Sequence, residues 1–276
     1  MNRMIPQTGK RGVRAVIFDI SGTTLDYGSV GPVLAFVKLF ARHKVTVSSE
    51  EARRPMGTHK KDHIWAMLTE PSICARWEKA HGRKPTRELM DRLYEEFAPL
   101  QKEVIKRHCD VILGVPEVVK ELRARGIKIA NTTGFDTGMM ADLIKLAARG
   151  GYAPDLWVCP DEVGKGRPAP WMAFHAARKL DLYPMSTFVK VGDTLADVAE
   201  AQAAGMWAVS VVRSGNEMGL SQKEMAALPA AELQARISAA RSRLASYGPH
   251  YLIDTAADLL PVVDEISARV AHGERP

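Results

Sequence analysis

Asp19 is the first residue whose type and position indicate chemistry. It follows the mostly apolar run 13–18 and opens the segment DISGTTLD. A buried strand that ends in a carboxylate and then turns at a glycine, here Gly22, places the acid beside free backbone N–H groups that can hold an anion. The segment therefore predicts a nucleophile at a strand end, although a strand followed by an ordinary turn would show the same pattern.

Two later strand ends also carry polar residues. Thr133 and Gly134 follow the second expected strand and offer a hydroxyl and a backbone N–H to a phosphoryl oxygen, unless Thr133 only caps the next helix. Asp193 and Asp197 follow the fourth, and such a pair of carboxylates suits Mg²⁺, which takes oxygen ligands. Alternatively, Asp193 caps a helix. Arg167 occupies a glycine-containing turn between them, where it could pair with an anionic substrate or face solvent.

These residues need a fold that brings strand ends together. After residue 107, short apolar runs alternate with helical patterns, which is typical of a doubly wound parallel sheet. In such an α/β, Rossmann-like core, loops from neighbouring strands meet at the carboxyl edge of the sheet. The expected strands cover 13–18, 127–131, 156–159, 187–191 and 207–212, the expected helices cover 116–125, 139–148, 171–180 and 196–203, and a helical stretch over 222–246 and a strand and helix within 251–270 complete the core.

Residues 28–106 interrupt this alternation. Their apolar residues recur at helical spacing, as around Phe36, and no strand pattern occurs among them. The sequence thus predicts an all-helical cap domain, 28–106, inserted into a core domain made of 1–27 and 107–276.

Composition excludes several classes of protein. No apolar stretch of about 18 residues is present, so we expect no membrane partner. The net charge is +6, but acidic residues lie among the basic ones and aromatic residues make up only 7%, so we expect no nucleic-acid partner. Residues 1–10 lack the apolar centre of a secretory signal. Cys74, Cys109 and Cys159 are widely spaced and odd in number, which fits reduced thiols rather than a disulfide framework or a CxxC metal site. We therefore expect a cytoplasmic protein.

The ordered set of strand-end residues resembles the haloacid dehalogenase superfamily of Mg²⁺-dependent phosphotransferases. The resemblance implies that Asp19 attacks phosphorus to form an aspartyl-phosphoenzyme, which water then hydrolyses. It also implies that Mg²⁺ is held by the Asp19 carboxylate, the Ser21 backbone carbonyl and Asp193, with Asp197 steadying a metal-bound water. The matching pieces are Asp19-x-x-Gly22-Thr23, Thr133, the cation Arg167 and Gly192-Asp193-x-x-x-Asp197.

Ser21 departs from the pattern of most phosphatases in this superfamily. Phosphomonoesterases carry a second Asp two residues after the nucleophile, and that acid protonates the departing alkoxide. A serine hydroxyl is a poor general acid because its pKa lies far above neutrality. We therefore expect a leaving group other than an alkoxide, stabilised by another part of the chain.

Lys60 in the helical insert is the candidate for that role. Thr58 is expected to cap a helix, which places Lys60 in the first turn and His63 on the same face. The helix dipole, the neighbouring Lys61 and burial would each lower the pKa of Lys60 from its ordinary ~10.4. A neutral lysine can condense with an aldehyde. The protonated imine then accepts the electrons of a breaking carbon–phosphorus bond, while His63 moves protons.

The cap segment and the core motifs together resemble the phosphonoacetaldehyde hydrolase (phosphonatase) family over about the whole chain. The resemblance implies hydrolysis of a small phosphonate substrate, phosphonoacetaldehyde, to acetaldehyde and phosphate by a homodimer with cap-region contacts. It assigns the Schiff base to Lys60 and the nucleophile to Asp19. The quoted motifs are Met56-Gly57-x-x-Lys60-x-x-His63, Asp19-x-x-Gly22-Thr23-Thr24-x-Asp26-Tyr27-Gly28 and Gly166-Arg167-Pro168-x-Pro170-Trp171-Met172, and the substrate-binding residues implied are Met56, Gly57, Thr133, Gly134 and Arg167.

Three positions differ from that family's usual residues. The family usually reads Asp-Trp-Ala-Gly-Thr where this chain has Ile20 and Ser21, and it usually has Tyr where Phe135 stands. Ser21 needs only its carbonyl for the metal, so ligation is retained. The missing aromatic ring and the missing hydroxyl change the fit of the substrate.

Other interpretations of the same residues remain. His59 and His63 are four apart, as in a helical zinc pair, but no third ligand follows and the lysines would repel the ion. Lys60 and Lys61 could be a solvated helix face. At the level of the whole chain, the alternatives are another phosphohydrolase of the superfamily, a 2-haloacid dehalogenase that needs neither Mg²⁺ nor a lysine, and a non-catalytic phosphate-binding relative.

Overall fold

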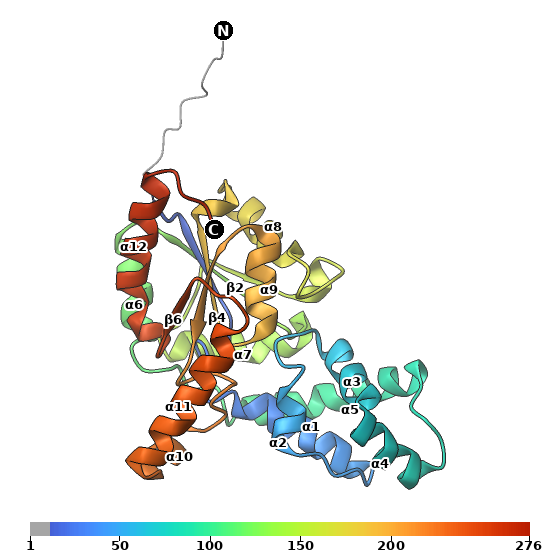
Figure 1. Cartoon of the computed structure of the whole chain (residues 1–276). Helices are drawn as coiled ribbons and strands as arrows, with labels where there is room; N and C mark the ends of the chain where they lie inside the picture. The colour runs from blue at the N-terminus through green and yellow to red at the C-terminus, as the bar shows by residue number, and fades with distance from the viewer. Residues whose placement is uncertain (1–11) are drawn as a thin grey trace.

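A computed structural model describes residues 12–276 of the chain, and its core is one parallel sheet (Figure 1). The strand order is β3-β2-β1-β4-β5-β6, the Rossmann order, and β1 pairs with both β2 and β4. The predicted doubly wound sheet is thereby confirmed, while residues 1–10 lie outside the described part. The strands are β1 (Ala15–Phe18), β2 (Lys128–Thr132), β3 (Leu156–Val158), β4 (Phe188–Gly192), β5 (Trp207–Val211) and β6 (Tyr251–Ile253).

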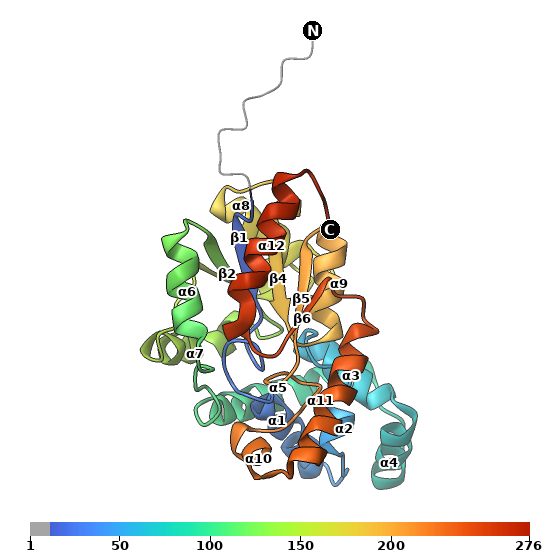
Figure 2. The same cartoon turned by 60° about the vertical axis from the view of Figure 1, so that its left-hand side comes forward.

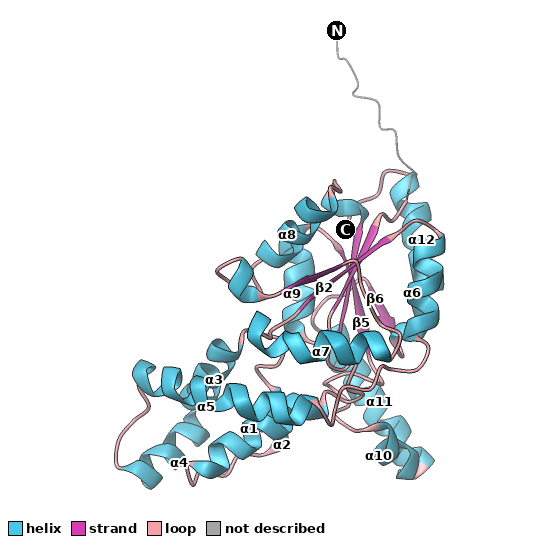
Figure 3. Ribbon diagram, turned by 180° about the vertical axis from the view of Figure 1, so that it is seen from behind, coloured by secondary structure: helices cyan, strands magenta, loops and turns pink. Residues whose placement is uncertain are grey.

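Helices cover both faces of this sheet. In Figures 1 and 3, α6 (Val115–Ala124) and α12 (Leu259–Ala271) lie on one face, and α8 (Trp171–Leu180) and α9 (Leu195–Ala204) lie on the other. Strand β1 shows why both faces must be covered, since Val16 and Phe18 join one apolar cluster and Ala15 and Ile17 join a second. Successive side chains of a strand point to opposite faces, so a strand that is apolar throughout needs a layer on each side.

Five of the six helices between β1 and β2 form the inserted cap. They gather beyond the carboxyl ends of the strands (Figures 1 and 2), and no strand occurs among them. Their core is apolar: the rings of Phe36 and Phe97 stack with centroids 4.4 Å apart. The predicted insertion is confirmed, and the domain boundaries at 27/28 and 106/107 stay predictions. The helices are α1 (Val30–Arg42), α2 (Ser49–Arg53), α3 (Lys60–Thr69), α4 (Pro71–His81) and α5 (Arg87–Ile105).

The remaining helices complete the core. Helix α7 (Thr137–Arg149) follows β2 and packs against α5 of the cap, as Figure 3 shows from behind. The predicted helical stretch over 222–246 consists of two helices, α10 (Gln222–Ala227) and α11 (Ala230–Ala245), with a break at Leu228 and Pro229. A residue that precedes proline is pushed into extended backbone, which ends α10.

The short 3₁₀ turns of the core are η1 (Pro160–Glu162), η2 (Met185–Thr187) and η3 (Ala256–Asp258). Over residues 12–276, no helix combines the length and the apolar character that crossing a membrane requires. The three cysteines are free thiols.

Candidate active site

Asp19, Asp193 and Asp197 come together at the carboxyl edge of the sheet. Asp19 follows β1 and the other two follow β4, and these strands are hydrogen-bonded neighbours. One carboxylate oxygen from each of the three acids lies within 4.8 Å of the others, and all three residues are buried. The site occupies the point where the strand order reverses, which is where open α/β sheets bind ligands. Three oxygen donors of this kind could hold a metal ion.

The loop after β1 aims Asp19 at Asp193. Gly22 has a φ of +82°, and a Cβ there would lie 2.2 Å from Oδ2 of Asp193, so only glycine fits. Thr23 donates its hydroxyl to Oδ1 of Asp193 over 3.0 Å, and Thr24 donates to the Asp19 carbonyl oxygen over 2.9 Å. The turn therefore makes specific contacts with the Asp193 side chain and with the Asp19 backbone, unlike an ordinary turn.

Asp193 does not cap a helix. The N-cap residue of α9 is Thr194, and Asp197 completes its capping box by accepting a hydrogen bond from the Thr194 backbone N–H over 3.2 Å. Asp193 instead accepts from Thr23 and from the backbone N–H of Asn216, 2.7 Å away. Burial and the charges of Asp19 and Asp197 raise the pKa of Asp193 well above its usual value.

Arg167 is buried among these acids, so the alternative of a solvated loop charge is wrong. Its guanidinium lies 2.7 Å from Asp19, 2.8 Å from Asp197 and 3.1 Å from Glu200. Burial raises the pKa of Asp19 despite the adjacent guanidinium. Burial would also raise the pKa of Asp197, but Arg167 and Lys190 outweigh it and hold that pKa below its usual value.

Sequence reasoning missed Lys190 and Glu200. The ammonium of Lys190, in β4, lies 3.1 Å from Asp197 and 3.2 Å from Glu200. The sequence signal that could have identified them is that Lys190 is the single charge in an otherwise apolar strand and that Glu200 lies in an alanine-rich helix. With four carboxylates and two cations, the cluster keeps two negative charges when all of its groups are ionised, which favours a divalent cation at this edge.

Thr133 and Gly134 also lie at this edge. The Thr133 hydroxyl accepts a hydrogen bond from the Phe135 N–H over 3.1 Å, and the N-cap residue of α7 is Asp136. The alternative that Thr133 caps the helix is therefore wrong. Thr133 and Gly134 line a pocket that also contains Asp19. Their role toward a substrate stays a prediction.

Lys60 enters the same pocket from the cap. It is the first residue of α3, is only 2% exposed, and its ammonium lies 4.9 Å from the centroid of the Phe135 ring. No hydrogen bond or ion pair ties that ammonium to another described residue. Burial and the charge of Arg167 lower the pKa of Lys60 to about 8, although Asp19 and Asp136 oppose them. A solvated face is therefore the wrong interpretation for Lys60.

Two details of the predicted cap helix are wrong. Thr58 does not cap α3, because the N-cap residue is His59 and the Thr58 hydroxyl donates to the Pro55 carbonyl over 2.8 Å. Lys61 does not depress the pKa of Lys60, because it points outward and pairs with Asp91 at 2.7 Å. The repelling cation comes from the core, as Arg167, rather than from the adjacent residue.

His63 is buried beside Lys60 and stacks on Phe36 with ring centroids 3.8 Å apart. Its Nε2 lies 2.9 Å from the Ala52 carbonyl oxygen, which can only accept, so Nε2 carries the hydrogen and Nδ1 keeps a lone pair. Within the described residues, Nδ1 has no hydrogen-bond partner. Burial and the charge of Lys60 lower the pKa of His63 well below its usual value, so the ring is neutral.

The zinc alternative gains no support. His59 turns to Asp136, with Nε2 2.9 Å from the carboxylate, while His63 faces Ala52. Among residues 12–276, the grouping of three or more possible metal ligands is the aspartate triad, and neither histidine belongs to it.

Cap and core approach closely around two glycines. A Cβ at Gly57 would lie 2.2 Å from the Thr194 hydroxyl, and a Cβ at Gly134 would lie 2.4 Å from the Thr58 carbonyl oxygen. With the cap seated so closely, the pocket holds only about 20 Å³, roughly the space of one water molecule. The pocket is lined by Asp19, Ser21, Ser29, Pro32, Met56, Gly57, Lys60, Thr133, Gly134, Phe135 and Thr194.

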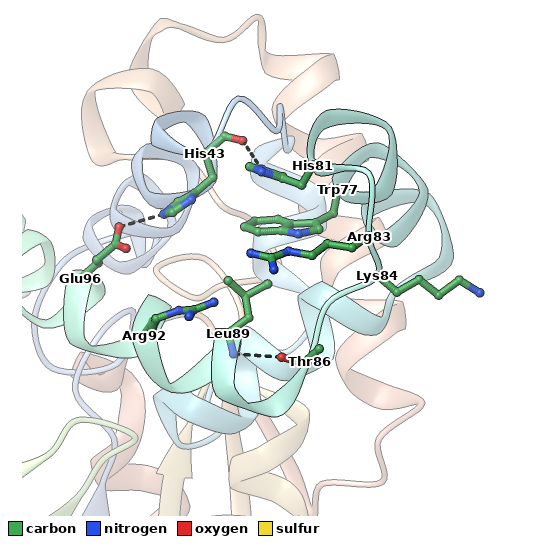
Figure 4. A pocket seen from close by; sticks show the side chains of 9 residues that line it. All are labelled: His43, Trp77, His81, Arg83, Lys84, Thr86, Leu89, Arg92 and Glu96. Atoms are coloured by element: carbon green, nitrogen blue, oxygen red, sulfur yellow. Dashed lines mark hydrogen bonds and ion pairs between the residues drawn. The ribbon is translucent and has the colours of Figure 1, made fainter.

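A larger cavity of about 190 Å³ lies within the cap (Figure 4). Trp77, Arg83 and Arg92 line it, and its carboxylate, Glu96, is paired with His43 at 2.8 Å. None of the aspartate triad reaches it. The smaller pocket at the sheet edge is therefore the candidate active site, because it is lined both by Asp19 of the triad and by Lys60, whose pKa is lowered.

Comparisons with known proteins agree with this geometry. Residues 13–205 match the family described as haloacid dehalogenase-like hydrolase. The chain is 44% identical over 264 residues to the phosphonoacetaldehyde hydrolase of Nitratidesulfovibrio vulgaris, which covers 96% of this chain and 94% of that protein. It is 42% identical over 254 residues to the phosphonoacetaldehyde hydrolase of Bacillus cytotoxicus, covering 92% and 96%.

A solved structure gives the same result. The crystal structure of a phosphonoacetaldehyde hydrolase-like protein from Oleispira antarctica superposes with a TM-score of 0.94 at 39% identity, over 100% of both chains. The family motifs, the curated relatives and the full-length structural match all agree. The chain is a hydrolase and belongs to the phosphonoacetaldehyde hydrolase family of the haloacid dehalogenase-like hydrolases.

Proposed function

We propose that this chain hydrolyses the carbon–phosphorus bond of phosphonoacetaldehyde to give acetaldehyde and phosphate. The relatives of that name support the substrate. The observation that carries the proposal is Lys60, a buried amine of lowered pKa that lines the same small pocket as Asp19. A phosphatase that releases an alkoxide has no need of such an amine. An enzyme that must turn a carbon into a leaving group does.

Lys60 forms the electron sink in this mechanism. With a pKa of about 8, about a tenth of the amine is neutral at pH 7, roughly two hundred times more than for an ordinary lysine of pKa ~10.4. The neutral amine adds to the aldehyde carbon, and with the uptake of one proton water leaves, which gives a protonated imine next to the carbon that bears phosphorus. Phe135 packs against the amine and helps to keep it from solvent.

Asp19 is the nucleophile. Its carboxylate oxygen forms a bond to phosphorus as the carbon–phosphorus bond breaks, and the released electron pair moves into the imine to give an enamine. Water then hydrolyses the aspartyl-phosphate. Protonation of the enamine carbon and hydrolysis of the resulting imine release acetaldehyde and restore Lys60. His63, whose Nδ1 keeps a free lone pair, is placed in our mechanism as the group that moves these protons.

A Mg²⁺ ion fits the acid cluster. Three buried carboxylates within 4.8 Å, with a net negative charge, are the hard oxygen donors that this ion prefers. We assign its ligands to Asp19, the Ser21 carbonyl and Asp193, with Asp197 at an ordered water. When bound, Mg²⁺ neutralises charge so that an anionic carboxylate can approach an anionic phosphonate.

Substrate binding falls to residues that face the acids. Arg167 would donate to phosphonate oxygens, as it now does to Asp19, and Thr133 and Gly134 would donate from the β2 loop. Met56 and Gly57 close the pocket from the cap. Because about 20 Å³ is too small for the substrate, we propose that residues 28–106 move as a unit to admit it.

Borohydride reduction tests the mechanism. The protein is mixed with phosphonoacetaldehyde, reduced and mapped by mass spectrometry. We expect one reduced adduct, on Lys60, and none on Lys61, which is adjacent in sequence but exposed and paired with Asp91. An adduct elsewhere, or none, would reject the imine and with it the proposed activity.

The assembly and location are proposed from the family. We expect a homodimer with contacts in the cap region, which light scattering coupled to gel filtration can check. The three free thiols support a reducing compartment, the cytoplasm.

A further inference from the structure

Arg53 joins the cap to two other parts of the chain. It is the last residue of α2, and its Nη1 donates to the Gly28 carbonyl oxygen over 2.8 Å and to that of Ser29 over 3.3 Å. Its Nη2 donates to the Gly219 carbonyl oxygen over 2.9 Å. The guanidinium therefore spans the linker before α1 and a loop of the core, and burial lowers its pKa despite the nearby Asp26 and Asp193.

Asn216, in that core loop, touches both Arg53 and Asp193. Its Oδ1 accepts from Nη1 of Arg53 over 3.3 Å, and its Nδ2 donates to the Arg53 carbonyl oxygen over 3.4 Å. Its backbone N–H donates to Oδ2 of Asp193 over 2.7 Å. A single residue, 4% exposed, thus connects a cap side chain to an acid of the triad.

The loop around Asn216 has little room to move. The Ser214 hydroxyl donates to the Gly22 carbonyl oxygen over 2.7 Å, and the Ser214 carbonyl oxygen accepts from the Gly28 N–H over 2.7 Å. A Cβ at Gly215 would lie 2.7 Å from the Asp193 Cβ. A shift of this loop would therefore displace the Asp193 side chain.

We propose that Arg53 and Asn216 are positioning residues that fix the Asp193 carboxylate in its metal-binding orientation when the cap is seated on the core. The proposal rests on the proposed function, in which Asp193 is a metal ligand. Asp193 carries opposing contacts, from the Thr23 hydroxyl on one oxygen and from the Asn216 backbone N–H on the other. Arg53 and the Asn216 side chain hold that N–H in place, so losing their contact lets the N–H shift and frees the carboxylate to rotate. Hydrogen-bond partners of metal ligands typically contribute 10–100-fold to metal affinity.

The test measures Mg²⁺ affinity by calorimetry without substrate. Arg53→Lys keeps the charge but cannot reach carbonyl groups on both sides, so we expect Mg²⁺ affinity to fall by about 10-fold or more. Arg76→Lys is the matched control, because Arg76 in α4 bonds only within the cap, to Thr46, Glu51 and Ser72, and should bind Mg²⁺ like the parent protein.

Asn216→Ala provides an independent variant that keeps the backbone N–H. We expect a similar loss of affinity, and the double variant with Arg53→Lys should lose no more than either single one, because both act through one contact. Thermal unfolding is recorded for each protein. Unchanged Mg²⁺ affinity in either single variant, with or without a lower Tm, would overturn the proposal, as would losses that simply add.

Failure of the underlying function gives a different result. Asp193→Asn should abolish Mg²⁺ binding if the triad holds the ion. Binding that persists in Asp193→Asn would reject the metal site itself, whereas loss there with parent-like affinity in Arg53→Lys would reject only the positioning role.

Discussion

The guanidinium of Arg167 lies 2.7 Å from the carboxylate of Asp19, although 148 residues separate them in the sequence. The same guanidinium contacts Asp197 and Glu200, so one cation from the loop before α8 holds one acid from the end of β1 and two acids from α9. The side chain of Arg167 has no solvent exposure. The charge of Arg167 is therefore balanced by these three carboxylates rather than by water.

Removal of Arg167 should destabilise the fold. Arg167→Ala leaves Asp19, Asp197 and Glu200 buried with only Lys190 as a cation, and the loss of one partner from a buried ion pair typically costs about 3–5 kcal/mol. Urea denaturation measures the free energy of unfolding. Arg125→Ala, which removes a surface arginine, is the control and should change it by less than about 1 kcal/mol. If Arg167→Ala lowers the free energy of unfolding by less than about 1 kcal/mol as well, the buried charge network does not stabilise the fold as we expect.

Lys60→Arg should abolish turnover while keeping a positive charge, because a guanidinium cannot form an imine. Release of acetaldehyde under steady-state conditions measures it. Lys61→Arg should retain parent activity, since Lys61 lies on the outer side of α3 and pairs with Asp91. Turnover in Lys60→Arg would disprove the Schiff base.

The activity should depend on pH through Lys60. Only the neutral amine adds to the aldehyde, so kcat/KM should rise about tenfold per pH unit below the pKa of about 8 and level off above it. The profile of the free enzyme reports this pKa. A plateau that begins only near pH 10 would mean that burial does not depress the pKa of Lys60.

The same pKa predicts a change of stability with pH. Because the folded pKa, about 8, lies below the unfolded one, near ~10.4, the unfolded chain binds more protons between these values, and stability rises as pH rises through this window. Below pH 8 the buried charge costs about 3 kcal/mol. Lys60→Met should therefore be more stable than the parent at pH 7, and this difference should shrink by pH 10 in urea denaturation.

Gly57→Ala should impair turnover by holding the cap away from the core. Its φ is +88°, and the new Cβ would lie 2.2 Å from the Thr194 hydroxyl. Gly82→Ala is the matched control, since Gly82 also has a positive φ, +69°, but meets no atom within 4 Å. Both variants carry about 1–2 kcal/mol of backbone strain. Only Gly57→Ala should lower kcat/KM, and equal kinetics in the two would show that close seating at Gly57 is dispensable.

A chelator should separate the metal-dependent attack on phosphorus from imine formation on Lys60. Removal of Mg²⁺ should stop phosphate release, because Asp19 can no longer approach the phosphonate, and added Mg²⁺ should restore it. The borohydride adduct on Lys60 should still form, since imine formation needs no metal. Release of halide from a 2-haloacid in the chelator would instead identify a dehalogenase.

Much of the architecture was predictable because it depends on local periodicity. Apolar strands of three to five residues, separated by amphipathic helices, require a sheet covered on both faces, and the strand order follows the Rossmann pattern. The meeting of Asp19 with Asp193 and Asp197 followed from the same rule, since adjacent parallel strands end at one edge. Helix caps were not predictable in the same way: Thr58 does not cap α3, whereas Thr194 caps α9. Capping depends on backbone angles that a residue type alone does not specify.

The sequence by itself determined the sheet, the helical insertion and the meeting of Asp19, Asp193 and Asp197 at the carboxyl edge. Only the tertiary structure decided which charges are buried and which partners they meet. Arg167 and Lys61 both lie in polar segments, yet one is enclosed by three acids and the other pairs at the surface. The physical reason is that burial and Coulomb energy depend on distances between segments far apart in the chain, whereas periodicity reports only on neighbours within a few residues.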